Sequence, residues 1–315
     1  MAWIAGTDLR FIDQASLGRN EIWLYVIAFP LVVLIGTGLL RLAAELLLAG
    51  GLDWTLELIL DPSASTEDVS PIMQAIGFAA VMWGFVAYLI GLIIVVRFLH
   101  GRPWQTLFYS GAGFNWTGFR VSLCLALLLP LVSLVLAITI SGETFEIHFD
   151  PLRFLILGGA IVVLMPLQVL AEEAFFRGYL MQAIGHFSRS FWVRLLLPAG
   201  IFTALHLTNR EVLEGGFWVI GIYAILAIYL GLLVLRGNGL EYAFGMHLGN
   251  NFYVALFVST ADSSLNTPAL IRMENMEWNA TVLVGLGLMF ALHYILTFSW
   301  MGLVHGRQAA RWRGP

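Results

Sequence analysis

The apolar residues of this 315-residue chain arrive in long blocks, and this pattern constrains the fold more than any other feature of the sequence. Each block is about 20 residues long, which as a helix crosses a hydrocarbon core of about 30 Å. The strands of a membrane barrel would alternate apolar and polar residues instead. We therefore expect an all-α, polytopic membrane bundle of about eight transmembrane helices, at about residues 21–41, 73–97, 120–141, 154–181, 193–209, 217–236, 241–260 and 279–303.

The composition agrees with a membrane protein and excludes several kinds of site. Hydrophobic residues make up 59% of the chain and charged residues 11%, against about 25% charged in ordinary soluble domains. All 16 basic residues are arginine, so a Ser/Lys dyad, a Schiff-base lysine and a P-loop lysine are excluded. The net charge of −4 is too small and dispersed to indicate a nucleic-acid partner.

The arginines also predict an orientation. The connections that share a side with the N-terminus carry most of them, and under the positive-inside rule that side is cytoplasmic. We expect an integral multi-pass protein of the cytoplasmic membrane with both termini in the cytoplasm. We divide the chain into N-terminal helices with their loops at 1–150, a core at 151–262, and an outer loop, last helix and basic tail at 263–315.

Three charged side chains interrupt the span at 154–181. A charge near the middle of a spanning helix costs roughly 2.5–3.5 kcal/mol, which indicates that Glu172, Glu173 and Arg177 have a function. Glu173 and Arg177 are four residues apart, about 40° around a helix, so they can pair. Glu172 lies about 140° from Arg177 and lacks a local partner, a state that suits a general base.

Two later spans carry polar pairs with the same one-turn spacing. The fifth span ends with Phe202 and His206, and the seventh contains His247 and Asn251, with Gly245 and Gly249 beside them to allow close approach of a neighbour. Taken singly, such a histidine is typical of a packed or interfacial residue, and such an asparagine of interhelical hydrogen bonding.

The ordered set Glu-Glu-x-x-x-Arg, Phe-x-x-x-His and His-x-x-x-Asn, with the extension Phe176-Arg177-Gly178, resembles the CPBP family. This family comprises the CAAX-protease and bacteriocin-processing intramembrane proteases, also called Abi, and includes type II CAAX prenyl endopeptidases. The resemblance covers about 110 residues, from roughly Phe154 to Ser259.

The resemblance implies a glutamate-dependent peptidase. Glu172 and His206 would activate a water, His247 and Asn251 would stabilise the oxyanion, and Glu173, Arg177 and Phe202 would hold these groups in place. The substrate would be a membrane-associated peptide or prenylated protein in contact with lipid, and no cofactor would be required.

Alternatives remain open at this point. Glu172, His206 and His247 could instead bind Zn²⁺ as a His₂Glu set in a metalloprotease. A non-catalytic scaffold or bacteriocin-immunity protein would keep the fold without turnover. A transporter is disfavoured because neither paired broken spans nor an inverted repeat is evident.

The remaining expectations concern geometry and isolated residues. For the three motifs to meet at one depth, the fourth span should continue past Leu180 and the fifth should begin near Pro198, with 186–194 as a loop. We expect His293 and Cys124 to be packing residues, and Arg41 and Glu45 to form a surface pair.

Overall fold

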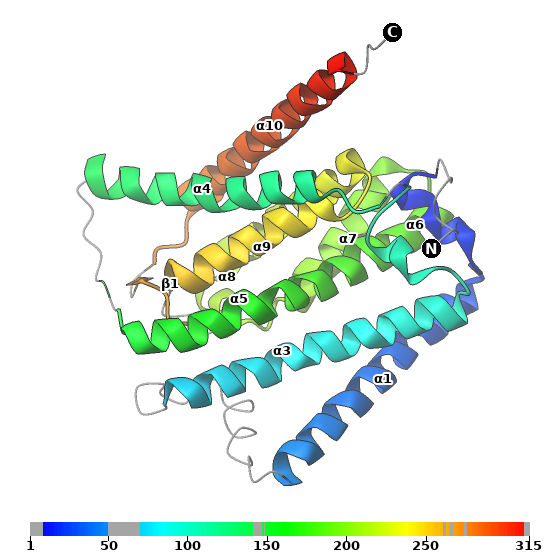
Figure 1. The fold of residues 1–315 in the computed structure, drawn as a ribbon, viewed down its shortest axis with the longest axis horizontal. Coiled ribbons are helices and arrows are strands. Elements are labelled where there is room, and N and C mark those ends of the chain that lie inside the picture. The colour runs from blue at the N-terminus through cyan, green and yellow to red at the C-terminus, as the bar shows by residue number, and fades with distance from the viewer. Residues whose placement is uncertain are drawn as a thin grey trace.

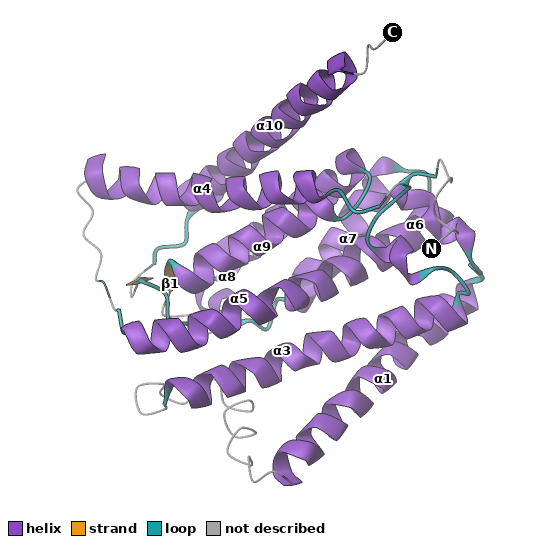
Figure 2. Ribbon diagram, viewed as in Figure 1, coloured by secondary structure: helices purple, strands orange, loops and turns teal. Residues whose placement is uncertain are grey.

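The computed structural model describes residues 9–49, 70–111, 113–140, 147, 149–260, 263–264, 267–273 and 276–311. The regular elements of this part of the chain are all helices apart from two short strands, as the sequence predicts (Figure 2). The α-helices are α1 (Ile22–Ala49), α3 (Pro71–Ile94), α4 (Trp116–Ile140), α5 (Pro151–Glu173), α6 (Met181–Phe187), α7 (Phe191–Leu205), α8 (Arg210–Gly237), α9 (Glu241–Leu256) and α10 (Ala280–Arg311).

Shorter elements complete the description. Two 3₁₀ helices, η1 (Phe11–Leu17) and η3 (Trp104–Leu107), lie before α1 and between α3 and α4. Two π-helical segments, η2 (Val95–Leu99) and η4 (Ala174–Leu180), continue α3 and α5 without a break. The strands β1 (Val258–Thr260) and β2 (Ile271–Met273) pair in parallel, with Val258 opposite Ile271.

Six helical segments of the described residues are long and apolar enough to cross a membrane. The predicted fifth and seventh spans are present as α7 and α9, but these helices have only 15 and 16 residues, about 22–24 Å. The helical membrane bundle is therefore confirmed, whereas the predicted count of eight transmembrane helices stays a prediction. The six long segments are Ile22–Leu46, Pro71–Leu99, Trp116–Ile140, Pro151–Phe187, Arg210–Gly237 and Ala280–Trp300.

The helices lie side by side in a bundle. In Figure 1, α1, α3, α5, α9, α4 and α10 follow one another across the molecule, and each neighbouring pair is in contact. Helices α7 and α8 pack together on the far side of this row in Figure 1, and α8 contacts both α9 and α10. The strands lie at one end of the bundle, and the N-terminal segment and α6 lie at the other.

Glycines set the spacing between α9 and α4. A Cβ on Gly245 would lie 2.5 Å from the carbonyl oxygen of Phe119, and one on Gly249 would lie 2.5 Å from the Cβ of Ala126. The predicted close approach at these two glycines is therefore confirmed, and the approaching element is α4. Helix α9, which carries His247 and Asn251, is held against a helix from outside the predicted core.

The fourth and fifth spans form a tight helical hairpin. Helix α5 continues through η4 and α6 as far as Phe187, so the expected extension past Leu180 is confirmed. Helix α7 begins at Phe191, and the expected late start near Pro198 is wrong, as is the long loop at 186–194. Ser190 caps α7 by accepting from the backbone N–H of Val193, and Pro198 is accommodated inside a helix that neighbouring helices support.

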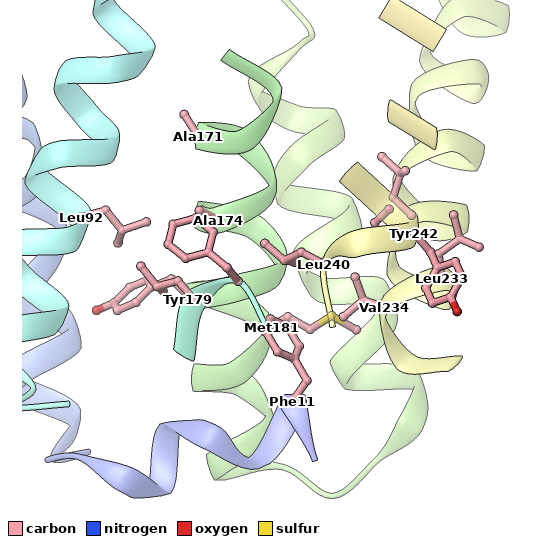
Figure 3. Close-up of a cluster of buried hydrophobic side chains, with 14 of the residues drawn as sticks. Phe11, Leu92, Ala171, Ala174, Tyr179, Met181, Leu233, Val234, Leu240 and Tyr242 are labelled. Carbon is pink, nitrogen blue, oxygen red and sulfur yellow. The ribbon is translucent and has the colours of Figure 1, made fainter. Parts of the chain in front are cut away.

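A hydrophobic cluster lies beneath the charged turn of the fourth span. Figure 3 shows side chains from η1, α3, the α5–η4–α6 helix and the α8–α9 region converging around η4. All of those labelled are no more than 7% exposed: Phe11, Leu92, Ala171, Ala174, Tyr179, Met181, Leu233, Val234, Leu240 and Tyr242. This cluster fixes the helix that presents Glu172 and Glu173.

Three isolated residues can be compared with expectation. His293 is buried and bonds the hydroxyl of Tyr229 and the carbonyl oxygen of Ser122, so it is a packed histidine as predicted. Arg41 and Glu45 form the expected exposed pair at 3.0 Å. Cys124 is exposed, and its predicted packing role is wrong because the buried face of α4 passes through Ser122, two residues away and on the opposite side of the helix.

Candidate active site

The two glutamates lie where α5 becomes the π-helical segment η4. Glu173 is the last residue of α5, and η4 begins at Ala174. Single π turns inside α-helices occur frequently at functional sites. Arg177, within this turn, donates from Nη1 to Oε1 of Glu173 at 2.9 Å, and the two side chains are only 2% and 0% exposed. The predicted pair is therefore present and buried.

Arg177 and Gly178 tie this turn to its neighbours. Nη2 of Arg177 donates to the carbonyl oxygen of Ala227 on α8 at 3.1 Å. A Cβ on Gly178 would collide with the backbone carbonyl of Leu107, so this position has room only for glycine. The motif glycine thus lets the loop between α3 and α4 pack directly on η4.

His247 lies between the two carboxylates. Its Nδ1 is 2.8 Å from Oε1 of Glu173, and its Nε2 is 3.6 Å from Oε2 of Glu172. Because an ionised carboxylate can only accept, Nδ1 carries a proton and donates it to Glu173. The side chain of Glu172 is 13% exposed and points toward the imidazole rather than away from the bundle.

His206 is fixed by its ring faces and by one hydrogen bond. Nδ1 lies 2.7 Å from the carbonyl oxygen of Phe202, one turn earlier on α7, so Nδ1 is the donor and neutral His206 keeps its lone pair on Nε2. The imidazole stacks on Phe202, with ring centroids 4.3 Å apart and planes at 28°. Phe202 also contacts His247, with ring centroids 6.1 Å apart, and so joins the second and third motifs.

Asn251 lies one turn beyond His247 and is oriented by a second amide. Its Nδ2 donates to Oε1 of Gln168 at 3.4 Å, and its Oδ1 accepts from Asn250 at 3.2 Å. Gln168 is one turn before Glu172 on α5. Among the residues that the structure describes, the second amide hydrogen of Asn251 has no partner that would prevent it from donating to a bound group.

The helix lengths explain how these groups reach one depth. Glu172 precedes the end of α6 by 15 residues, and His206 follows the start of α7 by 15 residues, so a short turn at 188–190 brings them level. His247 is only six residues into α9. It reaches the same region because the turn before α9 is sunk into the protein, with Leu240 fully buried and Glu241 4% exposed.

Residues from the N-terminal part of the chain cover this sunken turn. Asn238, in a left-handed conformation with φ of 59°, accepts from the backbone N–H of Phe11 at 2.7 Å. The N–H of Leu240 donates to the carbonyl oxygen of Phe108, and Glu241 accepts from the N–H of Asn115 at 3.0 Å. The predicted late start of α7 was therefore unnecessary, because it is α9 that begins deep.

Two polar neighbours of these motifs, Gln168 and Tyr223, are not predicted from the sequence. Gln168 could have been found, because it is an amide in an apolar span exactly one turn before Glu172. Tyr223, whose ring lies 4.6 Å from that of His206, belongs to none of the three motifs and lies on the next helix, between the second and third motifs in sequence. No local pattern marks it, because an aromatic residue in a spanning segment is most simply explained by packing.

The described residues do not present a ready metal centre. Among them, no group of three His, Cys, Asp or Glu side chains is arranged to hold a metal ion. Of the predicted set, Glu172 and His247 approach each other to 3.6 Å, and the ring of Phe202 contacts both His206 and His247.

Comparisons with known proteins cover the segment that carries these motifs. The family model described as Rce1-like, type II CAAX prenyl endopeptidase, matches residues 154–253, the segment that contains all three motifs. An uncharacterized protein of Bacillus subtilis (strain 168), YyaK, is 26% identical over 281 residues, which is 87% of this chain and 91% of that protein. No solved structure matches the chain significantly. Residues 154–253 of this chain are therefore similar to the Rce1-like family of type II CAAX prenyl endopeptidases.

Proposed function

We propose that this protein is an intramembrane endopeptidase that hydrolyses a peptide bond of a membrane-associated, lipidated protein or peptide. Glu172 and His206 activate the attacking water, and His247 and Asn251 form the oxyanion hole. The observation that carries the proposal is the position of Glu172, whose Oε2 lies 3.6 Å from Nε2 of His247. This separation is too long for a direct hydrogen bond, and it places the proposed base beside one of the two proposed oxyanion donors.

Glu172 is the general base. Arg177 is occupied by Glu173 and by the carbonyl oxygen of Ala227, so Glu172 is free to accept a proton from water. His206, with Nδ1 bound to Phe202, offers the lone pair of Nε2 to the same water. The hydroxide adds to the carbonyl carbon of the substrate, and Glu172 then returns the proton to the leaving amine nitrogen.

His247 and Asn251 bind the oxyanion. Because Nδ1 of His247 already donates to Glu173, donation to an oxyanion from Nε2 requires a doubly protonated imidazole. With that proton, Glu172, Glu173, Arg177 and His247 sum to zero formal charge, which suits a buried site. The second amide hydrogen of Asn251 supplies the second donor, and each such donor is worth about 2.7–4 kcal/mol in other hydrolases.

An apolar cavity beside the site fits a lipidated substrate. It has a volume of about 380 Å³, lies between α1, η4–α6 and α7, and is lined by Tyr25, Phe29, Phe175, Tyr179 and Leu197, among others. Phe175 directly precedes Phe176, whose ring packs on Phe202 at a centroid distance of 4.9 Å. A lipid chain held in this cavity would lie one layer of side chains away from the charged groups.

Replacement of Glu172 by Gln tests the proposal, because Gln keeps the size of the side chain and removes the base. We expect cleavage of a farnesylated peptide, followed by the new peptide termini, to disappear while membrane insertion persists. Glu45→Gln is the matched control, since it removes an exposed carboxylate far from the motifs and should cleave normally. Full activity of Glu172→Gln would rule out this mechanism, and absence of cleavage in the wild type would favour a scaffold or immunity protein.

A zinc-dependent form of the same hydrolysis is the second candidate. Both histidines bind an acceptor through Nδ1, which leaves Nε2 available, and metal-ligating histidines are commonly oriented in this way. Glu172, His206 and His247 would hold the ion, which would supply a bound hydroxide. Metal analysis of the purified protein, with chelator treatment and readdition of Zn²⁺, separates the two forms.

We also propose that the protein lies in the cytoplasmic membrane with both termini in the cytoplasm. The distribution of arginines between the two sides of the bundle supports this orientation. Reporter fusions at each terminus, active only on one side of the membrane, test it directly.

A further inference from the structure

Four side chains form a continuous stack that ends at a residue outside the three motifs. The guanidinium carbon of Arg177 lies 4.9 Å from the ring centroid of Phe202. Phe202 stacks on His206 at 4.3 Å, and the other neighbour of His206 is Tyr223, at 4.6 Å with ring planes at 31°. The stack crosses from η4 through α7 to α8, and the imidazole lies inside it.

Tyr223 is itself held in place by an anchored carboxylate. Its hydroxyl donates to Oε1 of Glu211 at 2.5 Å and accepts from Nδ2 of Asn209 at 3.0 Å, so both of its hydrogen-bonding functions are used. The other oxygen of Glu211 accepts from the backbone N–H of Ser264 at 2.9 Å and from the hydroxyl of Ser264. Glu211 thus connects Tyr223 to residue 264, between β1 and β2.

His206 needs such support because of where it lies. It is the C-cap of α7, beyond the last regular turn, and the backbone there continues into a turn rather than a helix. A single hydrogen bond, from Nδ1 to Phe202, fixes one edge of the imidazole but leaves the ring plane free to tilt. Two aromatic faces, one on each side, remove that freedom.

We infer that Tyr223 is a positioning residue for His206, and that Glu211 fixes Tyr223 from the strand end of the bundle. This inference rests on the proposed function, since it assigns a role through the water-activating imidazole. The ring of Tyr223 keeps Nε2 of His206 directed at the water, and misplacement of a catalytic group by about 1 Å can cost about 10²-fold in rate. Tyr223 touches neither substrate nor water in this scheme, so its loss should change kcat and not KM.

The test compares Tyr223→Leu with Tyr223→Phe in the full-length protein, using a farnesylated peptide whose fluorescence is quenched across the scissile bond. Tyr223→Leu removes the ring and should lower kcat about 10- to 100-fold with KM within about twofold. Tyr223→Phe keeps the ring and loses only the bond to Glu211, so it should recover most of that loss and remain about two- to tenfold below wild type.

Tyr229 provides the matched control. It lies on the same helix, and its hydroxyl bonds a histidine, His293, that is outside the site. Tyr229→Leu should lower the unfolding temperature and leave kcat within about twofold of wild type. A Tyr223→Leu protein with normal kcat, or with a loss that Tyr229→Leu matches, overturns the inference.

Two further outcomes keep the inference separable from the proposed function. If Tyr223→Leu does not accumulate in the membrane, Tyr223→Phe decides the matter: a lower kcat with unchanged KM supports the inference, and an unchanged kcat overturns it. Loss of cleavage in Glu172→Gln together with normal kcat in both Tyr223 variants overturns the positioning role alone. Persistent cleavage in Glu172→Gln instead overturns the proposed function.

Discussion

Removal of the arginine from the buried ion pair should be the most damaging single change at the site. Arg177 and Glu173 are 2% and 0% exposed, and Oε2 of Glu173 has no hydrogen-bond partner among the described residues. Arg177→Met therefore leaves a buried carboxylate whose remaining partner is His247. Breaking such a pair from one side costs about 3–5 kcal/mol, because the other charge stays buried without compensation.

This cost can be measured as a change in thermal stability. If each kcal/mol lowers the unfolding temperature by about 2–4 °C, Arg177→Met should unfold about 6–20 °C below wild type. Tryptophan fluorescence of the detergent-solubilised protein can follow the transition. Arg41→Met breaks an exposed pair of the same spacing and should cost about 0–1 kcal/mol.

A double variant shows whether the unpaired charge is the cause. Glu173→Gln with Arg177→Met removes both charges and keeps an oxygen that can accept from His247, so it should recover more than half of the lost stability. If the double variant is less stable than Arg177→Met alone, or if Arg177→Met costs no more than Arg41→Met, the reasoning is refuted.

Two further predictions concern the scaffold. Gly245→Ala should destabilise the protein by about 1–3 kcal/mol, because its Cβ would lie 2.5 Å from the backbone of α4. Gly159→Ala on α5 is the control, since its Cβ would have no neighbour within 4 Å and the change should be neutral or stabilising. Equal unfolding temperatures for the two variants would contradict this prediction. Burial lowers the pKa of His100 below its ordinary value, so the unfolded state binds the proton more readily and stability should fall as pH drops below about 6.5. His100→Asn should flatten the dependence of unfolding temperature on pH between 8 and 5, and parallel curves for variant and wild type would count against it.

Hydropathy was sufficient for the helical class and the positions of the apolar segments, because each segment must satisfy its own backbone hydrogen bonds in lipid. Helical spacing was sufficient for the Glu173–Arg177 pair, since residues four apart meet on any regular helix. Even the π turn between them did not separate the two groups. These features are local, and local geometry can be derived from sequence.

The errors arose where depth depends on other parts of the chain. The prediction of a late start for α7 is wrong because it requires α9 to begin at the membrane surface, whereas Leu240 is fully buried. The contact between Glu172 and His247 joins helices far apart in sequence, and the support of His206 by Tyr223 depends on how two consecutive helices pack. Spacing along one helix carries no information about which face of another helix it meets.

The covered turn before α9 limits what can be excised from this protein. The family match covers only residues 154–253. The residues that bind this turn come from outside that segment: they are Phe11, Phe108 and Asn115, which bind Asn238, Leu240 and Glu241 in that order. A fragment cut at those boundaries would expose the buried apolar residues of this turn. Helix α9 would then be free to shift, and His247 would move away from the two glutamates with it. The matched segment therefore does not form a complete folding unit. A chimera with a relative must include the N-terminal residues that cover this turn as well as the three motifs.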